Sequence, residues 1–395
     1  MKDEKKAPKL RFKGFIDDWE QRKLGDVCEP ITDSIDTQKY PNEVFSEYSM
    51  PAFDASMKPD IVLGSSMNSV RKIITRPCLL VNKLNVRKKR IWYVKKTNKN
   101  AVCSAEFIPL HSDTVDLTFL NQVAKSETFT RYLENHSSGS SNSQKRITPR
   151  SLMLSKLHIP TIEEQKLIGK IFEYLDHTIT LHEEKKRQLE RLKSALLQKM
   201  FADKSGYPPV RFEGFSDKWE QVKYGEIFQR RSKMGVSTPT LPSVEYDDIN
   251  PGMGTLNKEP KSKGISKRGI YFNPGDVLFG KLRPYLKNWL FACFEGVAVG
   301  DFWVLTSSKI DHGFTYSLIQ TPGFQYIANL SSGSKMPRSD WGLVSNARTF
   351  IPINHLEQER ISSVLFGLDH AITLYEHKLE ILNKIKSFLL QNMFI

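Results

Sequence analysis

Two segments of this 395-residue chain combine lysine and arginine with aromatic side chains, a combination that is typical of nucleic-acid binding. Lysine and arginine neutralise phosphates, whereas sequence specificity requires side chains at the base edges. The first candidate set is Arg71, Lys72, Lys83, Asn85, Arg87, Lys88, Lys89 and Arg90, next to Trp92 and Tyr93. The second candidate set is Lys261, Lys263, Lys267, Arg268, Lys281, Arg283, Tyr285 and Lys287. For any single residue, a solvated or phosphate-binding role competes with base reading.

Further along the chain, each set is followed by a Ser-Ser-Gly-Ser turn, at residues 137–140 and 331–334. Small residues let the main chain approach a groove closely, and side-chain types that can read bases come next. The turns add Ser140, Ser141, Asn142, Gln144, Lys145 and Arg146 in one segment, and Ser334, Lys335, Met336, Arg338 and Ser339 in the other. An ordinary loop after a helix is the alternative. Both turns keep the same four residues while the following ones change, which favours a functional role.

The net charge of +14 and the pI near 9.4 indicate a polyanionic partner, and nucleic acid fits best. Residues 2–6 are charged and no apolar segment follows them, so we expect no secretory signal. The most apolar window, 289–305, is interrupted by Glu295 and Asp301 and is too short to span a bilayer. We therefore expect a soluble protein in the cytoplasm, without a membrane partner.

The four cysteines, Cys28, Cys78, Cys103 and Cys293, have neither CxxC spacing nor histidines at the spacing of metal ligands. This pattern predicts buried structural thiols in a reducing compartment and no metal site.

No segment carries a complete catalytic signature. Residues 275–281 fit GxxxxGK, but Leu282 stands where a Mg²⁺-binding Ser or Thr is needed, and the segment is typical of a strand. Residues 182–186 begin like a zinc-protease helix but lack the second histidine, which predicts a solvated helix face. The chain shows no glycine-rich cofactor loop, no Asn/Asp-Pro-Pro-aromatic segment and no Glu-x-Lys after Pro59-Asp60. We predict no catalytic residues, so any reaction must be carried out by another protein.

The elements that position these residues occur twice. Residues 8–21 return as 208–221, 79–85 as 277–283, and 164–201 as 357–394, always in the same order. An internal repeat of this length indicates two copies of one domain. The repeated motifs persist while the residues between them diverge. We therefore expect two domains with the same fold but different recognition surfaces.

Each copy begins as an α+β domain. Strand-like runs lie at 78–81 and 91–94 in the first copy and at 277–279 and 302–305 in the second, and helices are expected at 119–133 and 315–330. The repeated aromatic residues Phe12, Phe15, Trp19, Phe212, Phe215 and Trp219 are predicted to pack in the core or at a domain seam. Residues that are the same in two domains that recognise different sequences are poor candidates for base recognition.

Each copy ends in a long helix with apolar residues at three- and four-residue steps. The spacer and partner-binding candidates are Ile168, Ile171, Phe172, Leu175, Ile179, Leu189, Leu192 and Leu196, then Ile361, Val364, Leu365, Leu368, Ile372, Leu382 and Leu389. A surface helix on its own domain is the alternative. Two helices of roughly 35 residues would be about 50 Å long, longer than a small domain is wide, which favours an antiparallel coiled coil.

The predicted domains are the heads at 1–160 and 206–353, the first spacer helix with its linker at 161–205, and the second spacer helix at 354–395. An antiparallel spacer predicts a dumbbell with approximate twofold symmetry. Two different basic heads at a fixed separation would read two half-sites of duplex DNA, so the site should be bipartite and asymmetric.

Taken together, the opening motif with Gly-Phe and Trp-Glu, the Ser-Ser-Gly turn, Ile-Pro before Glu-Gln, and the helix ending Leu-Leu-Gln-x-Met-Phe resemble the specificity subunit of type I restriction-modification systems. The resemblance covers nearly the whole chain, twice. Residues 275–284 also resemble a phrase of that family's target recognition domains, from which the first copy departs at Arg76-Pro77-Cys78.

The resemblance implies a non-catalytic subunit with two target recognition domains. It implies two modification subunits that methylate adenine, and two restriction subunits that translocate and cleave DNA. S-adenosylmethionine, ATP and Mg²⁺ would be used by those partners, and this chain would bind no cofactor. Two alternatives remain: a self-sufficient modification or cleavage enzyme with unrecognised motifs, and an RNA-binding assembly protein, which would prefer structured or single-stranded RNA.

Overall fold

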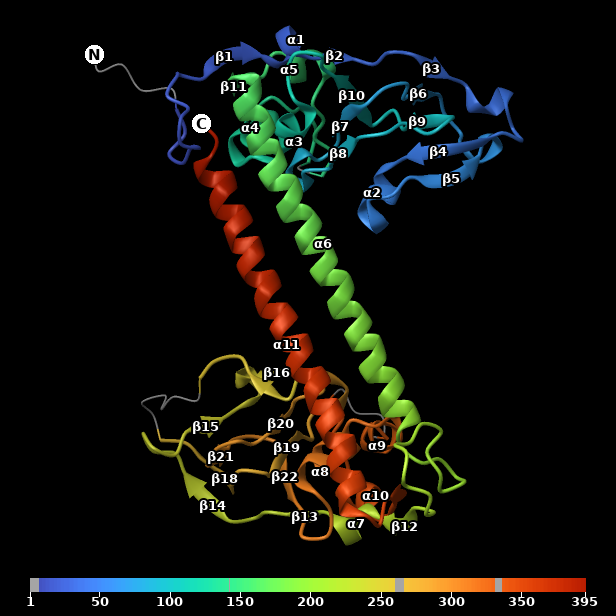
Figure 1. The fold of residues 1–395 in the computed structure, drawn as a ribbon, viewed down its shortest axis with the longest axis vertical. Helices are drawn as coiled ribbons and strands as arrows, with labels where there is room; N and C mark the ends of the chain where they lie inside the picture. The colour runs from blue at the N-terminus through green and yellow to red at the C-terminus, as the bar shows by residue number, and fades with distance from the viewer. Residues whose placement is uncertain (1–6, 142, 260–265, 331–335) are drawn as a thin grey trace. The chain divides into compact units, whose positions relative to one another are not determined.

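The computed structural model describes residues 7–141, 143–259, 266–330 and 336–395. It divides into two compact units, of which unit 1 comprises Met1–Leu181 with Leu379–Ile395 and unit 2 comprises His182–Lys378. Each unit contains a mixed sheet-and-helix domain and parts of two long helices (Figure 1), so the α+β fold class is confirmed. We call the domain of unit 1 head 1 and that of unit 2 head 2.

Unit 1 contains three sheets. Its strands are β1 (Glu20–Lys23), β2 (Glu29–Pro30), β3 (Ser34–Ile35), β4 (Val44–Tyr48), β5 (Asp60–Leu63), β6 (Arg71–Ile73), β7 (Cys78–Asn82), β8 (Ile91–Val94), β9 (Ala101–Cys103), β10 (Phe107–His111) and β11 (Lys156–Ile159). Its helices are α1 (Leu24–Val27), α2 (Met50–Ser56), α3 (Leu117–Lys125), α4 (Glu127–Asn135), α5 (Pro149–Met153) and the first half of α6 (Ile162–Lys199), with 3₁₀ turns η1 (Thr37–Lys39), η2 (Gly64–Ser66) and η3 (Val86–Lys88). The strand orders are β1-β11, β2-β10-β7-β8 and β3-β6-β9-β4-β5.

Unit 2 repeats this plan with changes outside the central sheet. Its strands are β12 (Glu220–Lys223), β13 (Gln229–Arg230), β14 (Met234–Val236), β15 (Ser243–Val244), β16 (Ile249–Asn250), β17 (Thr255–Leu256), β18 (Arg268–Phe272), β19 (Val277–Gly280), β20 (Trp289–Phe291), β21 (Gly296–Ala298), β22 (Phe302–Thr306) and β23 (Arg348–Ile351). Its helices are α7 (Tyr224–Ile227), α8 (His312–Ile319), α9 (Pro322–Ala328), α10 (Trp341–Asn346) and most of α11 (His355–Asn392), with 3₁₀ turns η4 (Tyr246–Asp248) and η5 (Pro284–Leu286). The strand orders are β12-β23, β13-β22-β19-β20, β14-β18-β21-β15 and β16-β17.

The repeat persists in the strand register. Glu20 pairs with Ile159 in unit 1, as Glu220 pairs with Ile351 in unit 2. The central sheets, β2-β10-β7-β8 and β13-β22-β19-β20, correspond strand for strand, whereas the second sheet has five strands in head 1 and four in head 2. The two heads therefore share a core and differ at its margin.

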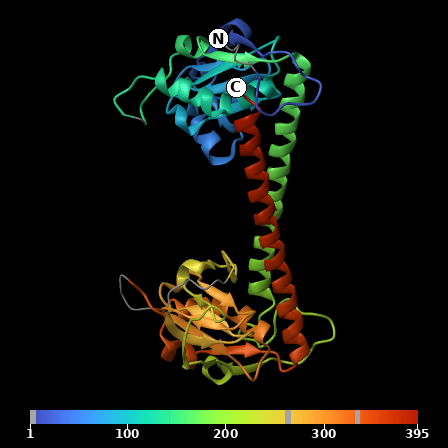
Figure 2. The same ribbon diagram turned by 90° about the vertical axis from the view of Figure 1, so that its left-hand side faces the viewer.

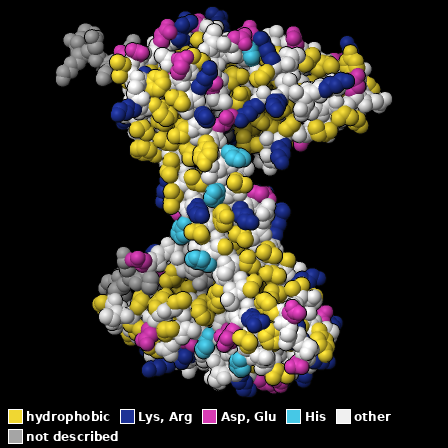
Figure 3. All heavy atoms as spheres, viewed as in Figure 1, with side chains coloured by type: hydrophobic (Ala, Val, Ile, Leu, Met, Phe, Trp, Pro, Cys, Tyr) yellow, Lys and Arg dark blue, Asp and Glu magenta, His cyan; other side chains and the backbone are white. Residues whose placement is uncertain are grey.

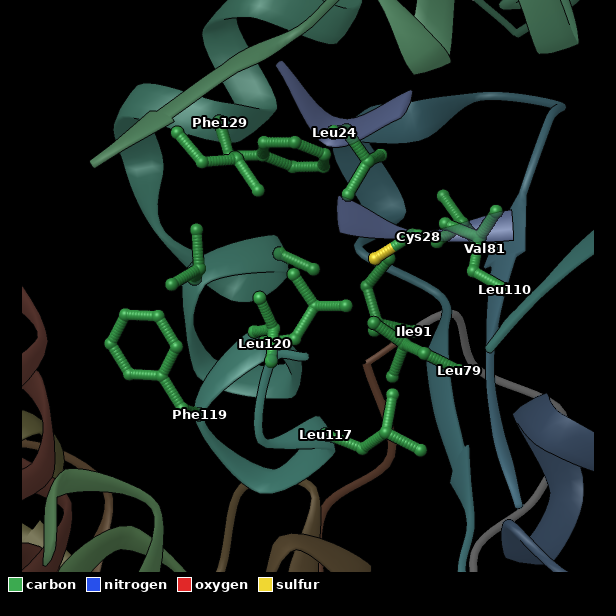
Figure 4. Packing of buried hydrophobic residues seen from close by; sticks show 14 of the residues in the cluster. Leu24, Cys28, Leu79, Val81, Ile91, Leu110, Leu117, Phe119, Leu120 and Phe129 are labelled. Carbon is green, nitrogen blue, oxygen red and sulfur yellow. The ribbon is translucent and has the colours of Figure 1, made fainter. Parts of the chain in front are cut away.

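Repeated tryptophans anchor both cores. Trp19 and Trp219 are each 2% exposed, and each meets a phenylalanine from the end of a long helix, Phe394 and Phe201 respectively. Figure 4 shows part of the cluster in head 1, where side chains of the central sheet meet those of α3 and α4. The predicted packing role is confirmed for both tryptophans and for Phe12 and Phe212, which are half-buried against the two cores, while Phe15 and Phe215 are half-buried outside these clusters.

The helices expected at 119–133 and 315–330 are each two helices. Ser126 ends α3 and caps α4, because its hydroxyl accepts the amide hydrogen of Phe129. Thr321 does the same for Phe324, and Pro322 has no amide hydrogen with which to continue α8. Both breaks were missed because apolar periodicity continues across them.

In each unit, the two long helices pack antiparallel. In unit 2, Lys186 pairs with Glu376 at 2.6 Å and Lys193 with Asp369 at 2.5 Å, so residue numbers rise on α6 as they fall on α11 (Figure 1). In unit 1, Lys386 pairs with Asp176 at 2.5 Å. The predicted antiparallel helix pair is confirmed. Leu192 and Val364 point outward, at 47% and 37% exposure.

The start of each copy is fastened to two helix ends. Arg11 forms two hydrogen bonds with Glu164 in unit 1, and Arg211 does the same with Glu357 in unit 2. The amide of Leu10 also donates to the carbonyl of Asn392 at 2.8 Å, so the C-terminal helix end lies against head 1 (Figure 2). Each head thus holds the end of the other copy's helix.

One cysteine prediction is wrong. Cys28, Cys78 and Cys103 are buried, and burial raises the pKa of each thiol to about 12. Cys293 is exposed, because it lies in the short connection between β20 and β21. Within the described ranges, no helix is both long and apolar enough to cross a membrane.

Candidate nucleic-acid interface

The two basic segments form the same loop in both heads. We call residues 83–89, between β7 and β8, basic loop 1, and residues 281–287, between β19 and β20, basic loop 2. The amide of Lys83 donates to Glu106 and that of Lys281 to Asp301, both at 2.8 Å. A 3₁₀ turn follows in each loop, η3 or η5. The sequence places different side chains on one backbone frame.

Main-chain hydrogen bonds join each basic loop to the segment after the Ser-Gly turn. In head 1, the amide of Asn85 donates to Lys145 at 2.9 Å, and that of Ile147 donates to Lys83 at 3.0 Å. In head 2, the amide of Arg283 donates to Pro337, and that of Ser339 donates to Lys281, both at 2.8 Å. The structure therefore brings together two candidate segments that are far apart in the sequence.

Each basic loop holds two non-glycine residues in the left-handed backbone region. These are Asn85 (φ 51°) and Lys89 (φ 46°) in head 1, and Arg283 (φ 49°) and Lys287 (φ 58°) in head 2. Such residues are uncommon, and their strain is retained where the surroundings impose the conformation. The same two positions of the loop carry it in both heads.

Several basic candidates in head 1 are engaged within the protein. Arg90 is 8% exposed and forms two hydrogen bonds with Asp54, at 2.7 and 2.6 Å. The other ion pairs are Arg71 with Glu47, Arg87 with Glu134, Lys89 with Glu127 and Arg146 with Glu106. Lys72 donates to the carbonyl of Ile31 at 3.4 Å. These residues hold the loops in place, and Arg90 is a structural residue.

In head 2, acidic residues bind part of the basic set. Asp301 pairs with Arg338 at 2.9 Å and lies 3.6 Å from Lys281, and Lys267 pairs with Glu245 at 2.7 Å. The hydroxyl of Tyr246 donates to the Asp301 carbonyl and accepts the amide of Leu282, and burial raises its pKa to about 12. Through these two hydrogen bonds Tyr246 fixes the start of basic loop 2, a role that no sequence signal indicated.

The remaining candidates differ in how far they are engaged. Those that form no ion pair with any described residue are Lys83, Asn85, Lys88, Lys145, Arg268, Arg283, Tyr285 and Lys287. Ser140 donates to Gln144 at 3.1 Å, Ser141 contacts Ser143, Ser339 is 7% exposed and Met336 is 49% exposed. Asn142, Lys261, Lys263, Ser334 and Lys335 lie outside the described residues.

Figure 3 shows lysine and arginine side chains interspersed with acidic ones on the visible faces of both heads. On these faces charges of both signs are mixed, so the loops are distinguished by their geometry and not by charge density alone. Among the described residues, no three histidine, cysteine or acidic side chains are grouped as metal ligands. Gly275 lies in a turn (φ 87°), most of the GxxxxGK segment forms strand β19, and the short 3₁₀ turn η5 follows it, so the segment is not a phosphate-binding loop before an α-helix.

The long helices carry a second candidate surface, which is apolar. In unit 1, Tyr174, Leu181, Ile381, Ile385 and Phe388 are 42–71% exposed. Residues at steps of three, four and seven share one side of a helix, so each helix contributes a stripe. Figure 3 shows hydrophobic side chains gathered over this part of α11. We call these five residues helix face 1.

Comparison with known proteins shows which family this chain resembles. Residues 16–191 match the family described as "Type I restriction modification DNA specificity domain". The resemblance seen in the sequence is confirmed: residues 16–191 are similar to the DNA specificity domain of type I restriction-modification systems, and the relatives and solved structures below agree with it.

Two curated relatives support this assignment. One is the HindI specificity subunit of Haemophilus influenzae, 26% identical over 199 residues, which are 50% of this chain and 43% of the relative. The other is the MjaVIII specificity subunit of Methanocaldococcus jannaschii, 23% identical over 256 residues, which are 58% of this chain and 59% of the relative. The matches span about half the length of these relatives.

Two solved structures share the fold over nearly the full chain. The type I S subunit from M. genitalium matches with a TM-score of 0.68 at 15% identity, covering 98% of this chain and 99% of that one. A chain from a study of complex assembly and conformational transition of the type I R-M system matches with a TM-score of 0.52 at 18% identity, covering 96% and 98%. At such identities the likeness establishes the fold.

Proposed function

We propose that this chain recognises a bipartite, asymmetric site on duplex DNA, one half-site for each head. The observation that carries this proposal is the pair of basic loops. They share their main-chain hydrogen bonds and left-handed residues but present different side chains. One backbone frame with two sets of side chains is what the reading of two different half-sites requires.

The test is genome-wide mapping of methyladenine in a host with and without this chain. The expected result is a set of methylated positions that depends on the chain and shares one split motif with a fixed gap. Chain-dependent methylation without a shared motif would contradict sequence recognition. A single continuous motif without a gap would contradict the recognition of two separate half-sites by the two heads.

We also propose that helix face 1 binds a modification subunit and that the exposed apolar residues of the helices in unit 2 bind a second one. Those residues include Leu192, Val364 and Leu374, at 37–47% exposure. Exposed apolar side chains on helices favour docking of partner helices. Restriction subunits would then join this core.

In this proposal the chain has no catalytic activity and acts in the cytoplasm. S-adenosylmethionine, ATP and Mg²⁺ would be bound by the partner subunits. The test mixes the purified chain with these three compounds and a plasmid that carries the mapped motif. No methylation and no cutting are expected, and either activity without partners would reject a purely recognising role. A preference for structured RNA over duplex DNA in the same preparation would favour an RNA-binding protein.

A further inference from the structure

One position in the basic loops combines a strained backbone, an unengaged polar side chain and a difference between the heads. Asn85 and Arg283 occupy it, at the start of η3 and η5, with φ of 51° and 49°. Each amide donates to the segment after the Ser-Gly turn, to Lys145 or to Pro337. Each carbonyl accepts from the last residue of the 3₁₀ turn, Lys88 at 3.0 Å or Leu286 at 2.9 Å. The backbone at this position is thus held by the same two hydrogen bonds in both heads.

The neighbouring positions do not combine these properties. Lys83 matches Lys281, and Lys89 matches Lys287, so shared charge at these positions cannot distinguish two half-sites. Val86 and Pro284 are buried.

The remaining differences in the loops have other uses. Arg87 is held by Glu134. Its counterpart Tyr285 lines a cavity of about 570 Å³ against α6. At the next position, Lys88 is an exposed point charge and Leu286 is apolar.

The side chains of Asn85 and Arg283 are available. Both residues are partly exposed, and neither side chain has a hydrogen bond or ion pair with a described residue. Among the described residues, the buried Nε atom of Arg283 has no hydrogen-bond partner, and its guanidinium forms no ion pair with the acids that bind Arg338 and Lys267. Asparagine tolerates the left-handed region, whereas arginine at this φ is unusual, and a glycine would avoid the strain. The retention of a long basic side chain there indicates a use for it.

We propose that this position reads a base in each half-site: Asn85 reads an adenine and Arg283 reads a guanine. Asparagine can form two hydrogen bonds with N6 and N7 of adenine, and arginine can form two with O6 and N7 of guanine. Lys83 and Lys287, the two lysines at the shared positions that form no ion pair with a described residue, bind phosphates and set the register. This inference rests on the proposed DNA recognition and assigns its chemistry to two residues.

The test is selection of a randomised duplex library by the full-length chain, followed by sequencing, for the native protein and for Arg283→Asn, Arg283→Gly and Asn85→Arg. In the native selection, one guanine in one half-site and one adenine in the other are expected to be preferred by about tenfold to a hundredfold. Arg283→Asn should lose the guanine preference at that position only. Asn85→Arg should convert the adenine preference to guanine in the other half-site. Arg283→Gly removes the backbone strain, so loss of the guanine preference in this variant cannot be attributed to misfolding.

Lys88→Ala is the matched control, because a phosphate contact should weaken all sequences equally and lower the salt dependence of binding. The inference is overturned if the Arg283 or Asn85 variants behave like this control, or if their selected motifs are unchanged. If the native chain selects no duplex sequence at all, the proposed function itself fails. The two failures are therefore distinguishable.

Discussion

Lys125, the last residue of α3, occupies a position in unit 1 that Gln320, the residue just after α8, occupies in unit 2. In unit 2, Gln320 accepts a hydrogen bond from Lys193, the partner of Asp369. In unit 1, Lys125 instead adds a second lysine near Asp176, which already pairs with Lys386. Burial lowers the pKa of Lys125 from 10.5 to about 8, nearby Asp176 opposes this shift and Lys386 reinforces it.

Replacement of Lys125 with glutamine should stabilise unit 1 at pH 7 by about 1–2 kcal/mol, part of the roughly 3 kcal/mol that the lowered pKa represents. Below pH 8, the lysine is protonated in both folded and unfolded chains, so the native protein bears the full cost of burying the charge. Between pH 8 and 10.5, the folded protein releases the proton while the unfolded chain keeps it, so the cost falls as pH rises. Urea unfolding at pH 7 and pH 9.5 should show the advantage of Lys125→Gln shrinking at the higher pH.

The conservative variant Lys125→Arg is the control, because it keeps the charge at both pH values and should not stabilise. A Lys125→Gln advantage that is constant from pH 7 to 9.5 would show that packing, and not titration, distinguishes the two residues.

The candidate loops could be predicted from the sequence, but which of their basic side chains form ion pairs within the protein could not. Arg87 and Arg283 look alike in a sequence, yet Arg87 is held by Glu134 and Arg283 is not paired with an acid in the described part of the chain. The acids that hold the loops, such as Glu106 and Asp301, come from other strands, so their pairing depends on the fold. The left-handed backbone at Asn85 and Arg283 also has no glycine to signal it.

At the scale of elements, a buried ion pair fastens the start of each copy to its long helix. Glu357 is 1% exposed and binds Arg211 through both oxygens at 2.7 and 2.9 Å, and the Nε1 of Trp219 donates to it at 3.3 Å. In unit 1, Glu164 binds Arg11 in the same way. The pair joins the opening segment, the core tryptophan and the helix start.

Arg211→Met should destabilise unit 2 by about 3–5 kcal/mol, because it leaves the Glu357 carboxylate buried without its cation. Urea unfolding that follows the fluorescence of both heads should show the loss in unit 2 while unit 1, which keeps Arg11 and Glu164, is unaffected. The double variant Arg211→Met with Glu357→Leu should recover much of the stability, since no charge is then buried. A single variant as stable as the native protein would show that water reaches Glu357.

The exposed apolar stripe on α11 makes a different prediction. Ile385→Asp combined with Phe388→Asp should leave stability nearly unchanged, because these side chains are 42% and 56% exposed. The same variant should weaken binding of a purified modification subunit at least tenfold in a titration, because it places charges in an apolar contact. Asn383→Asp with Ser387→Asp is the control, with the same charge added to another side of the helix. Equal binding by both double variants would remove helix face 1 from the interface.

The long helices were predictable because their apolar residues repeat at three- and four-residue steps over their whole length. The breaks at Ser126 and Thr321 were not, because a single capping residue interrupts a helix without disturbing the apolar pattern around it. The polar contacts between α6 and α11 were also not predicted. His182 was expected to be solvated, but its ring lies edge-on against that of Tyr375, with ring centroids 5.4 Å apart.

At the scale of the whole molecule, the repeat predicted two related domains but not how the copies exchange parts. Just after the helix of the first copy, Phe201 packs on Trp219 of head 2, and just after the second helix, Phe394 packs on Trp19 of head 1. Chain order alone does not contain this exchange, because it depends on antiparallel pairing. The domain boundaries and the dumbbell remain predictions.

The long helices are expected to set the length of the gap between the two half-sites. Deletion of residues 183–189 from α6 together with 372–378 from α11 removes blocks that contain the paired Lys186 and Glu376. Seven residues are about two helical turns, so the apolar residues that join α6 and α11 stay in register. The helices shorten by about 10 Å, and the heads should rotate by only about 20°. Methyladenine mapping should then show both half-sites unchanged and the gap shortened by about three base pairs, since successive pairs lie roughly 3.4 Å apart. The control replaces the same blocks with heptads of equal length that keep the seam residues, and its gap should equal that of the native protein. An unchanged gap in the deletion variant would mean that the helices do not set the spacing and that the DNA, or a partner subunit, does.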